Sequence, residues 1–173
     1  ANVVTDISEQ KQAESAAYRR IRQIACLNYI GRRIETEPKV SEFLKWVATR
    51  VPSAMEYSAL CVVAIEIERD DQRGRTIYGQ IEAIDSVHRV VERLSVCDET
   101  IGRLYVAYTQ ERHFSDEDKT LVGDIARRVS GYIESRRLSE RVQTGLDRVR
   151  SAHQRYSPAQ WTKHPIELTP SAS

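Results

Sequence analysis

Three cysteines and four histidines are the residues of this sequence best suited to chemistry, and their spacing limits what they can do. Cys26, Cys61 and Cys97 are separated by intervals that match neither a disulfide framework nor a Cys-x-x-Cys metal site. We expect Cys26 and Cys61 to be buried structural residues, since a buried cysteine behaves as a small hydrophobic side chain. Cys97 stands beside a predicted hairpin turn and should be the most accessible of the three thiols.

Other patterns associated with catalysis or binding are weak. No histidine spacing predicts a metal site, and the seven glycines give neither Gly-x-Gly-x-x-Gly nor Gly-x-x-x-x-Gly-Lys. Acidic residues at positions 66, 68, 70 and 71 run into a predicted turn, which we interpret as a solvated hairpin. Arginines between positions 127 and 141 alternate with acidic residues, which indicates a solvated helix face rather than a nucleic-acid or lipid patch. We therefore expect no enzymatic activity.

Two helices are predicted to open the chain. Residues 8–35 contain no proline and are rich in helix-forming residues. Small or apolar residues recur there at steps of three or four, which places them on one stripe: Ala17, Ile21, Ile24, Leu27, Gly31 and Ile34. A second helix should follow Pro38, with Ser41 as its N-cap, and should end at Pro52.

The centre of the chain has the two-residue period of strands. Residues 60–67 are apolar on both alternating faces over most of their length, so this strand should lie inside a sheet with both sides covered. Residues 76–83 should form a weaker strand, and residues 88–109 a hairpin. Short links between the four strands indicate a largely antiparallel sheet.

A long helix should follow, capped by Ser115 and with acidic residues in its first turn. Its expected buried face consists of Leu121, Val122, Ile125, Val129 and Ile133. Further on, small or apolar residues recur at steps of 4, 3, 4, 3 and 4: Leu138, Val142, Gly145, Val149, Ala152 and Tyr156. This is the heptad spacing with which two helices wrap around each other.

Length and composition narrow the class of protein. A chain of 173 residues, 40% hydrophobic and 29% charged, suits one domain with extensions. The net charge of +1 argues against a dedicated nucleic-acid binder. No apolar run approaches the roughly 20 residues of a membrane span, and the first residues show no signal-peptide pattern. We therefore expect a cytoplasmic protein that does not insert into membranes.

The order of these elements, together with three stretches of sequence, resembles a GAF domain of the bacterial sensory and signalling type. The stretches are Ile-Gly-Arg-Leu-Tyr-Val-Ala-Tyr at 101–108, Phe-Ser-Asp-Glu-Asp at 114–118, and the start of the last helix at 121–133. The resemblance covers residues 18–141. It implies an α+β fold, with a central antiparallel sheet, N- and C-terminal helices packed on one face, and the C-terminal helix extended as a coiled coil.

In this family, loops and short helices often enclose a ligand over the other face of the sheet. Here that segment is reduced to residues 84–87, and neither the Asn-Lys-Phe-Asp-Glu signature of cyclic-nucleotide-binding members nor the Cys-His pair of bilin-binding members is found. The cofactor is therefore unknown. His88, which lies where the missing lid would meet the sheet, and Cys97 are the candidate cofactor-binding residues.

We divide the chain into an N-terminal helical extension (1–17), a GAF-like domain (18–137), a coiled-coil-like extension (138–156) and an irregular tail (157–173). The expected function is a non-enzymatic regulatory module that forms a homodimer and relays conformational change to an effector domain or partner protein. The expected dimer interface consists of Ile21, Ile24, Leu138, Val142 and Val149. One alternative is a carrier of a small molecule or chromophore such as haem, bilin or a nucleotide. Another is a subunit of a larger assembly that docks through tail residues Trp161 and Ile166.

Overall fold

The computed structural model describes residues 2–69 and 74–156, and the expected docking residues Trp161 and Ile166 lie outside these ranges. The chain divides into two compact units after Ser135, and each unit is described by itself. The elements in chain order are α1 (Asn2–Glu35), α2 (Val40–Arg50), two 3-10 turns (Val51–Ala54 and Ser58–Leu60), β1 (Cys61–Glu68), β2 (Arg75–Gly79), α3 (Glu82–Asp85), β3 (Arg89–Val96), β4 (Glu99–Tyr108) and α4 (Asp116–Arg155). Among the described helices, none has the length and apolar character that a bilayer crossing needs.

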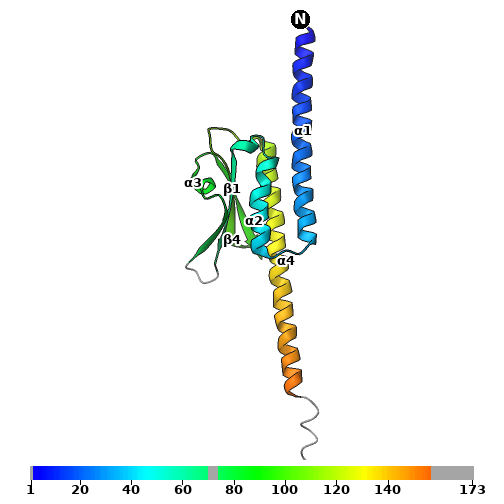
Figure 1. Cartoon of the computed structure of the whole chain (residues 1–173), viewed down its shortest axis with the longest axis vertical. Helices are drawn as coiled ribbons and strands as arrows, with labels where there is room; N and C mark the ends of the chain where they lie inside the picture. Colours follow the sequence, from blue (N-terminus) through cyan, green and yellow to red (C-terminus); the bar gives the residue numbers. More distant parts are fainter. Residues whose placement is uncertain (1, 70–73, 157–173) are drawn as a thin grey trace, which may run out of the picture. The chain divides into compact units, whose positions relative to one another are not determined.

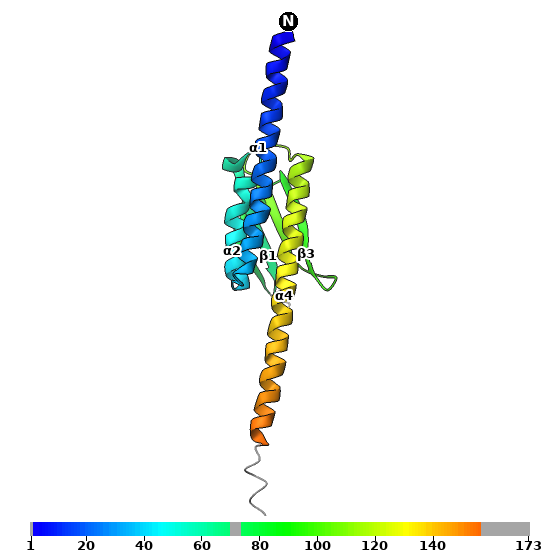
Figure 2. The ribbon, with the colours of Figure 1, turned by 90° about the vertical axis from the view of Figure 1, so that its right-hand side faces the viewer.

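The first unit is built on a four-stranded antiparallel sheet in the order β2-β1-β4-β3. α2 and the first part of α4 cover one face, and α3 lies on the other (Figure 1). α1 lies over α2 and α4 on the side away from the sheet (Figure 2). β1 is an interior strand whose first six residues are all buried, which confirms the prediction for residues 60–67.

The main core lies between the sheet and the helices. Phe43 of α2 and Tyr132 of α4 meet edge to face, with ring centroids 4.6 Å apart. The expected inner face of α4 is buried throughout: Leu121, Val122, Ile125, Val129 and Ile133. Because burying each such side chain contributes about 1.5–3 kcal/mol, this layer supplies much of the folding free energy of the unit.

The two expected helix caps have different outcomes. Ser115 caps α4 as predicted, because its Oγ accepts a hydrogen bond from the Asp118 backbone N–H at 3.1 Å. The prediction for Ser41 is wrong. α2 begins at Val40, and Lys39, two residues before Ser41, occupies the cap position with no side-chain cap bond.

The prediction of a strand over residues 76–83 is wrong in its second half. β2 ends at Gly79, whose φ of +101° is open to glycine and strained for other residues. The backbone then turns, and the Gln80 N–H donates to the Val63 carbonyl at 2.8 Å. A Cβ at position 79 would stand 2.2 Å from that carbonyl oxygen. This turn starts α3 instead of continuing the strand.

The solvated-hairpin interpretation is wrong for Glu66, whose residue is only 4% exposed. Tyr105 of β4 donates its hydroxyl to Glu66 Oε2 at 2.8 Å, and Arg75 of β2 lies 2.8 Å from Oε1. A carboxylate is tolerated here because both oxygens are satisfied, one of them by a cation. The neighbouring strands supply both partners.

Candidate functional site

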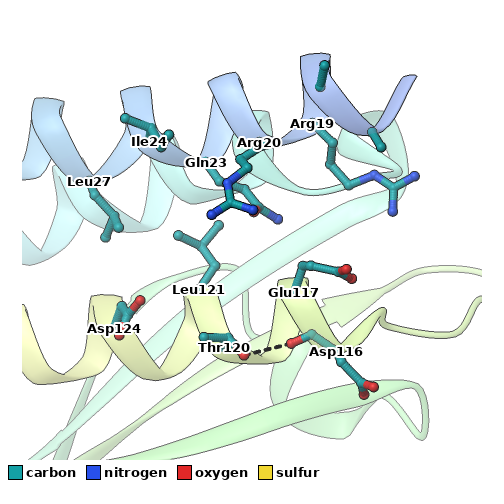
Figure 3. Close-up of a pocket in the computed structure, with 12 residues that line it drawn as sticks. Arg19, Arg20, Gln23, Ile24, Leu27, Asp116, Glu117, Thr120, Leu121 and Asp124 are labelled. Atoms are coloured by element: carbon teal, nitrogen blue, oxygen red, sulfur yellow. Dashed lines mark hydrogen bonds between the residues drawn. The ribbon is translucent and has the colours of Figure 1, made fainter. Parts of the chain in front are cut away.

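A groove of about 580 Å³ lies between α1 and the first turns of α4, within the first unit. Figure 3 shows its walls facing each other. The residues that line it are Ala16, Ala17, Arg19, Arg20, Gln23, Ile24 and Leu27 from α1, and Asp116, Glu117, Thr120, Leu121 and Asp124 from α4.

The two walls of the groove have opposite charge. α1 contributes Arg19 and Arg20, whereas α4 contributes Asp116, Glu117 and Asp124. The acids belong to the start of α4, where the helix dipole favours negative charge. Three of these charged groups form ion pairs with residues outside the groove lining. Arg19 pairs with Glu56 at 3.3 Å, Asp116 with Lys119 at 3.6 Å, and Asp124 with Arg127. Among the described residues, Arg20 and Glu117 have no ion-pair partner.

Asp118 joins three elements beside this groove. It is fully buried, and its carboxylate accepts from Gln23 Nε2 of α1 at 3.2 Å and from the Tyr108 hydroxyl of β4 at 3.4 Å. Burial, together with the Asp118 charge, raises the pKa of Tyr108, so this hydroxyl stays protonated and remains a donor. One side chain at the start of α4 therefore fixes both α1 and the end of β4.

The residues expected to form a dimer interface are exposed in each unit. Ile21 and Ile24 of α1 are 62% and 52% exposed, and Ile24 also lines the groove. In the second unit Leu138, Val142 and Val149 of α4 are 51%, 63% and 66% exposed.

Sequence reasoning missed Leu146, which is also half-exposed in the second unit. It stands four residues after Val142 and three before Val149. This spacing also fits the apolar stripe, but the predicted heptad pattern placed the adjacent Gly145 in the seam instead of Leu146. A Cβ at Gly145 would meet nothing within 4 Å. The apolar stripe of this unit is therefore wider than predicted, and Leu146 flanks the seam.

The candidate cofactor residues are not brought together. His88 precedes β3, where its carbonyl accepts from the Tyr108 N–H at 3.0 Å and its N–H donates to Ser86 Oγ at 3.2 Å. Cys97 lies in the turn after β3, with a φ of +50° and its thiol donating to Glu134 at 3.3 Å. The strand of eight residues between them is about 26 Å long. No group of three or more potential metal ligands occurs within residues 2–69 and 74–156.

The three cysteines are distributed as expected, with Cys26 and Cys61 buried and Cys97 exposed. Burial raises the pKa of the Cys26 thiol to about 11, although the Arg50 charge opposes this shift. Burial, and then the charge of Asp118, raises the pKa of Cys61 to about 12. Both thiols are therefore protonated and poorly nucleophilic near neutral pH.

A second, smaller core occupies the other face of the sheet. Ala83 of α3 is fully buried there against small and aromatic side chains of β1 and β4, with Ile84 packed beside it. The buried strand residues of this cluster are Val62, Ala64, Tyr105 and Ala107. α3 thus covers the start of β1 and the end of β4, and it leaves the face of β3 exposed.

This arrangement, with helices on one face of the sheet and a short segment on the other, is a GAF-like α+β fold. A solved structure that shares it is the GAF domain of a putative sensor histidine kinase from Pseudomonas syringae pv. tomato. The two are 17% identical with a TM-score of 0.54, and the match covers 79% of this chain and 98% of that chain. No protein-family model and no curated protein matches the sequence.

Proposed function

We propose that the chain is a non-enzymatic sensory or regulatory module of the GAF type that acts in the bacterial cytoplasm. In this proposal it forms a parallel homodimer through α1 and the second half of α4, and it relays conformational change to an effector domain or partner protein. The GAF-like fold, which is shared with the GAF domain of a putative sensor histidine kinase, supports the sensory role. Side chains of the chain itself support the dimer and the relay.

The observation that carries the dimer is the apolar stripe of the second unit. Leu138, Val142, Leu146 and Val149 recur at steps of three and four on one helix and are all at least 50% exposed. A single helix has no core in which to bury them, and burying each would contribute about 1.5–3 kcal/mol. A second copy of the same helix offers the matching surface.

The charged groove supports the same arrangement in the first unit. In a twofold dimer, each contact between two different surface regions occurs twice. The basic α1 wall of one copy can then face the acidic α4 wall of the other, which provides partners for Arg20 and Glu117. Ile21 and Ile24, exposed on α1, would lie within this contact.

Asp118 supports the relay. It bonds Tyr108 at the end of β4 and Gln23 on α1, and it belongs to α4 itself. A movement of the sheet would therefore act on both helices that form the proposed dimer. Because α4 continues to Arg155, it can pass that movement to whatever binds its end.

The test replaces both Val142 and Val149 with glutamate. We expect the wild-type chain to be a dimer at micromolar concentration, and the V142E/V149E variant to dissociate at least tenfold more readily, because like charges would meet across the seam. Light scattering measures the mass, and circular dichroism reports the fold.

The matched control is T144E/S151E, which adds the same charge to the same helix away from the stripe. It should remain dimeric. A monomeric wild-type chain, or equal dissociation of both variants, would contradict the proposed dimer.

A further inference from the structure

β3 is an edge strand whose outer backbone groups can be assigned from the register. The Tyr108 N–H donates to the His88 carbonyl, and the pairing of β3 with β4 continues in antiparallel register from there. Because hydrogen-bonded and non-hydrogen-bonded pairs alternate, residues 90 and 92 turn their N–H and C=O groups toward β4. Those of Arg89, Val91 and Arg93 point away from the sheet.

Ser95 confirms this assignment. Its N–H also points away from β4, and it donates to Ser130 Oγ of α4 at 3.1 Å. α4 therefore closes the free edge at its far end. At Arg89, Val91 and Arg93 no hydrogen bond to the described residues closes it, and all three residues are exposed. Unpaired groups of this kind are a template for an added strand.

The side chains of these three residues lie on the sheet face opposite α2 and α4. Directly across from Arg93 stands Arg103 of β4, on the same face and also exposed. Like charges in directly opposed positions destabilise a sheet. Arg89 lies over the Tyr105 ring, with its guanidinium carbon 5.7 Å from the ring centre.

Arg89 and Arg93 have no carboxylate within 4.0 Å in the part of the chain that the structure describes, whereas Arg103 is attracted by Glu66, its neighbour across β1, and by Glu68. By contrast Arg75, on the other edge of the sheet, lies 2.8 Å from Glu66. One explanation for charged side chains on an edge strand is that they prevent aggregation and have no other role. That explanation does not cover Val91, an apolar residue that is 40% exposed between the two arginines of the edge.

We propose that the free edge of β3 binds an extended acidic segment of a partner protein as a fifth strand. Its backbone would pair with Arg89, Val91 and Arg93. Its side chains on the open face would follow the pattern acidic, any, apolar, any, acidic, with alternate residues about 7 Å apart. The acid opposite Arg93 would also reach toward Arg103 and offset the repulsion between the two arginines.

A nucleic-acid partner fits this face less well. Single-stranded nucleic acids bind sheets by stacking bases on exposed aromatic rings. The aromatic residue on this face, Tyr105, is only 6% exposed, and Arg89 lies over its ring. A nucleic acid would also leave the outward N–H and C=O groups of β3 without hydrogen-bond partners.

The test uses two fluorescently labelled peptides of identical composition and the full chain. The matched peptide is Thr-Glu-Thr-Val-Thr-Glu-Thr, and the shuffled peptide is Thr-Glu-Val-Thr-Glu-Thr-Thr, which places its acids on opposite faces of an extended strand. We expect the matched peptide to bind at least tenfold more tightly by fluorescence anisotropy. Its binding should shift the NMR amide signals of residues 89, 91 and 93 more than those of 90 and 92.

The variant R93Q/R103Q should weaken binding of the matched peptide at least fivefold and keep its circular dichroism spectrum, since both side chains are exposed. The control R32Q/K45Q removes the same charge from exposed positions on α1 and α2 and should bind as the wild type does. Equal affinity for both peptides, an equal loss in both variants, or amide shifts elsewhere would overturn the proposal. Tighter binding of a labelled oligothymidine, weakened by R93Q/R103Q, would overturn it in favour of nucleic acid.

Discussion

Replacing Gly102 with alanine should lower the free energy of unfolding by about 3 kcal/mol and the melting temperature by about 6–12 °C. A Cβ at this position would stand 2.1 Å from the Glu66 carbonyl oxygen and 3.1 Å from the Ile67 Cα. Both atoms belong to the backbone of β1, which cannot rotate away. The central β1–β4 pair would have to separate locally.

The glycine is needed because of an irregularity in β4. The register between β3 and β4 shifts at Leu94 and Ser95, so that Ile101 and Gly102 together occupy the space of one residue on the partner strand. Gly102 then comes unusually close to β1.

Gly131 provides the matched control. It lies within α4, and a Cβ there would meet nothing within 4 Å. G131A should therefore raise the free energy of unfolding by about 0.5–1 kcal/mol, because alanine loses less backbone entropy in a helix. Urea unfolding measures both changes. A G102A variant as stable as G131A would show that β4 does not approach β1 this closely.

The second large effect is expected at Asp118. D118A should cost about 2–4 kcal/mol, since it leaves the buried Tyr108 hydroxyl without its acceptor and removes the partner of Gln23. E117A is the control, because Glu117 is an exposed acid of the same helical turn. Its loss should cost only about 0.3–0.5 kcal/mol through the helix dipole.

Unfolding curves in urea, fitted for both variants, measure this difference. Hydrogen exchange adds a readout specific to the proposed coupling, since α1 amides near Gln23 should exchange faster in D118A than in E117A. Equal stability of the two variants would show that the buried carboxylate does not hold the three elements together.

The elements that could be predicted from sequence are those whose signal is local. The two apolar faces of β1 and the Ser115 cap are each set by residues within a few positions of one another. The helix–sheet core followed from the same periodicity. The turn at Gly79 was missed because a single glycine in an apparent strand gives no sign of its φ until the neighbouring strand is placed.

The parts of the site that were missed depend on residues distant in sequence. Glu66 is buried because Tyr105, 39 positions away, donates to it across the sheet, and neither residue alone signals the pair. The sequence identifies Asp118 as a first-turn acid, but its bond to Gln23 joins two residues that are 95 positions apart in the chain. The exposed arginines of β3 and β4 could not be predicted to lie together, because only the strand register places Arg93 opposite Arg103.

The most direct test of the proposed parallel dimer is disulfide formation at the seam. In a chain carrying Cys97→Ser, V142C should cross-link two copies under mild oxidation, because equivalent seam positions lie within disulfide reach in a parallel pair of helices. Cys26 and Cys61 are buried with raised pKa values and should not interfere. A non-reducing gel should show a dimer for V142C and a monomer for the off-seam variant T144C. A V142C variant that stays monomeric, or a T144C variant that cross-links equally well, would contradict the proposed seam.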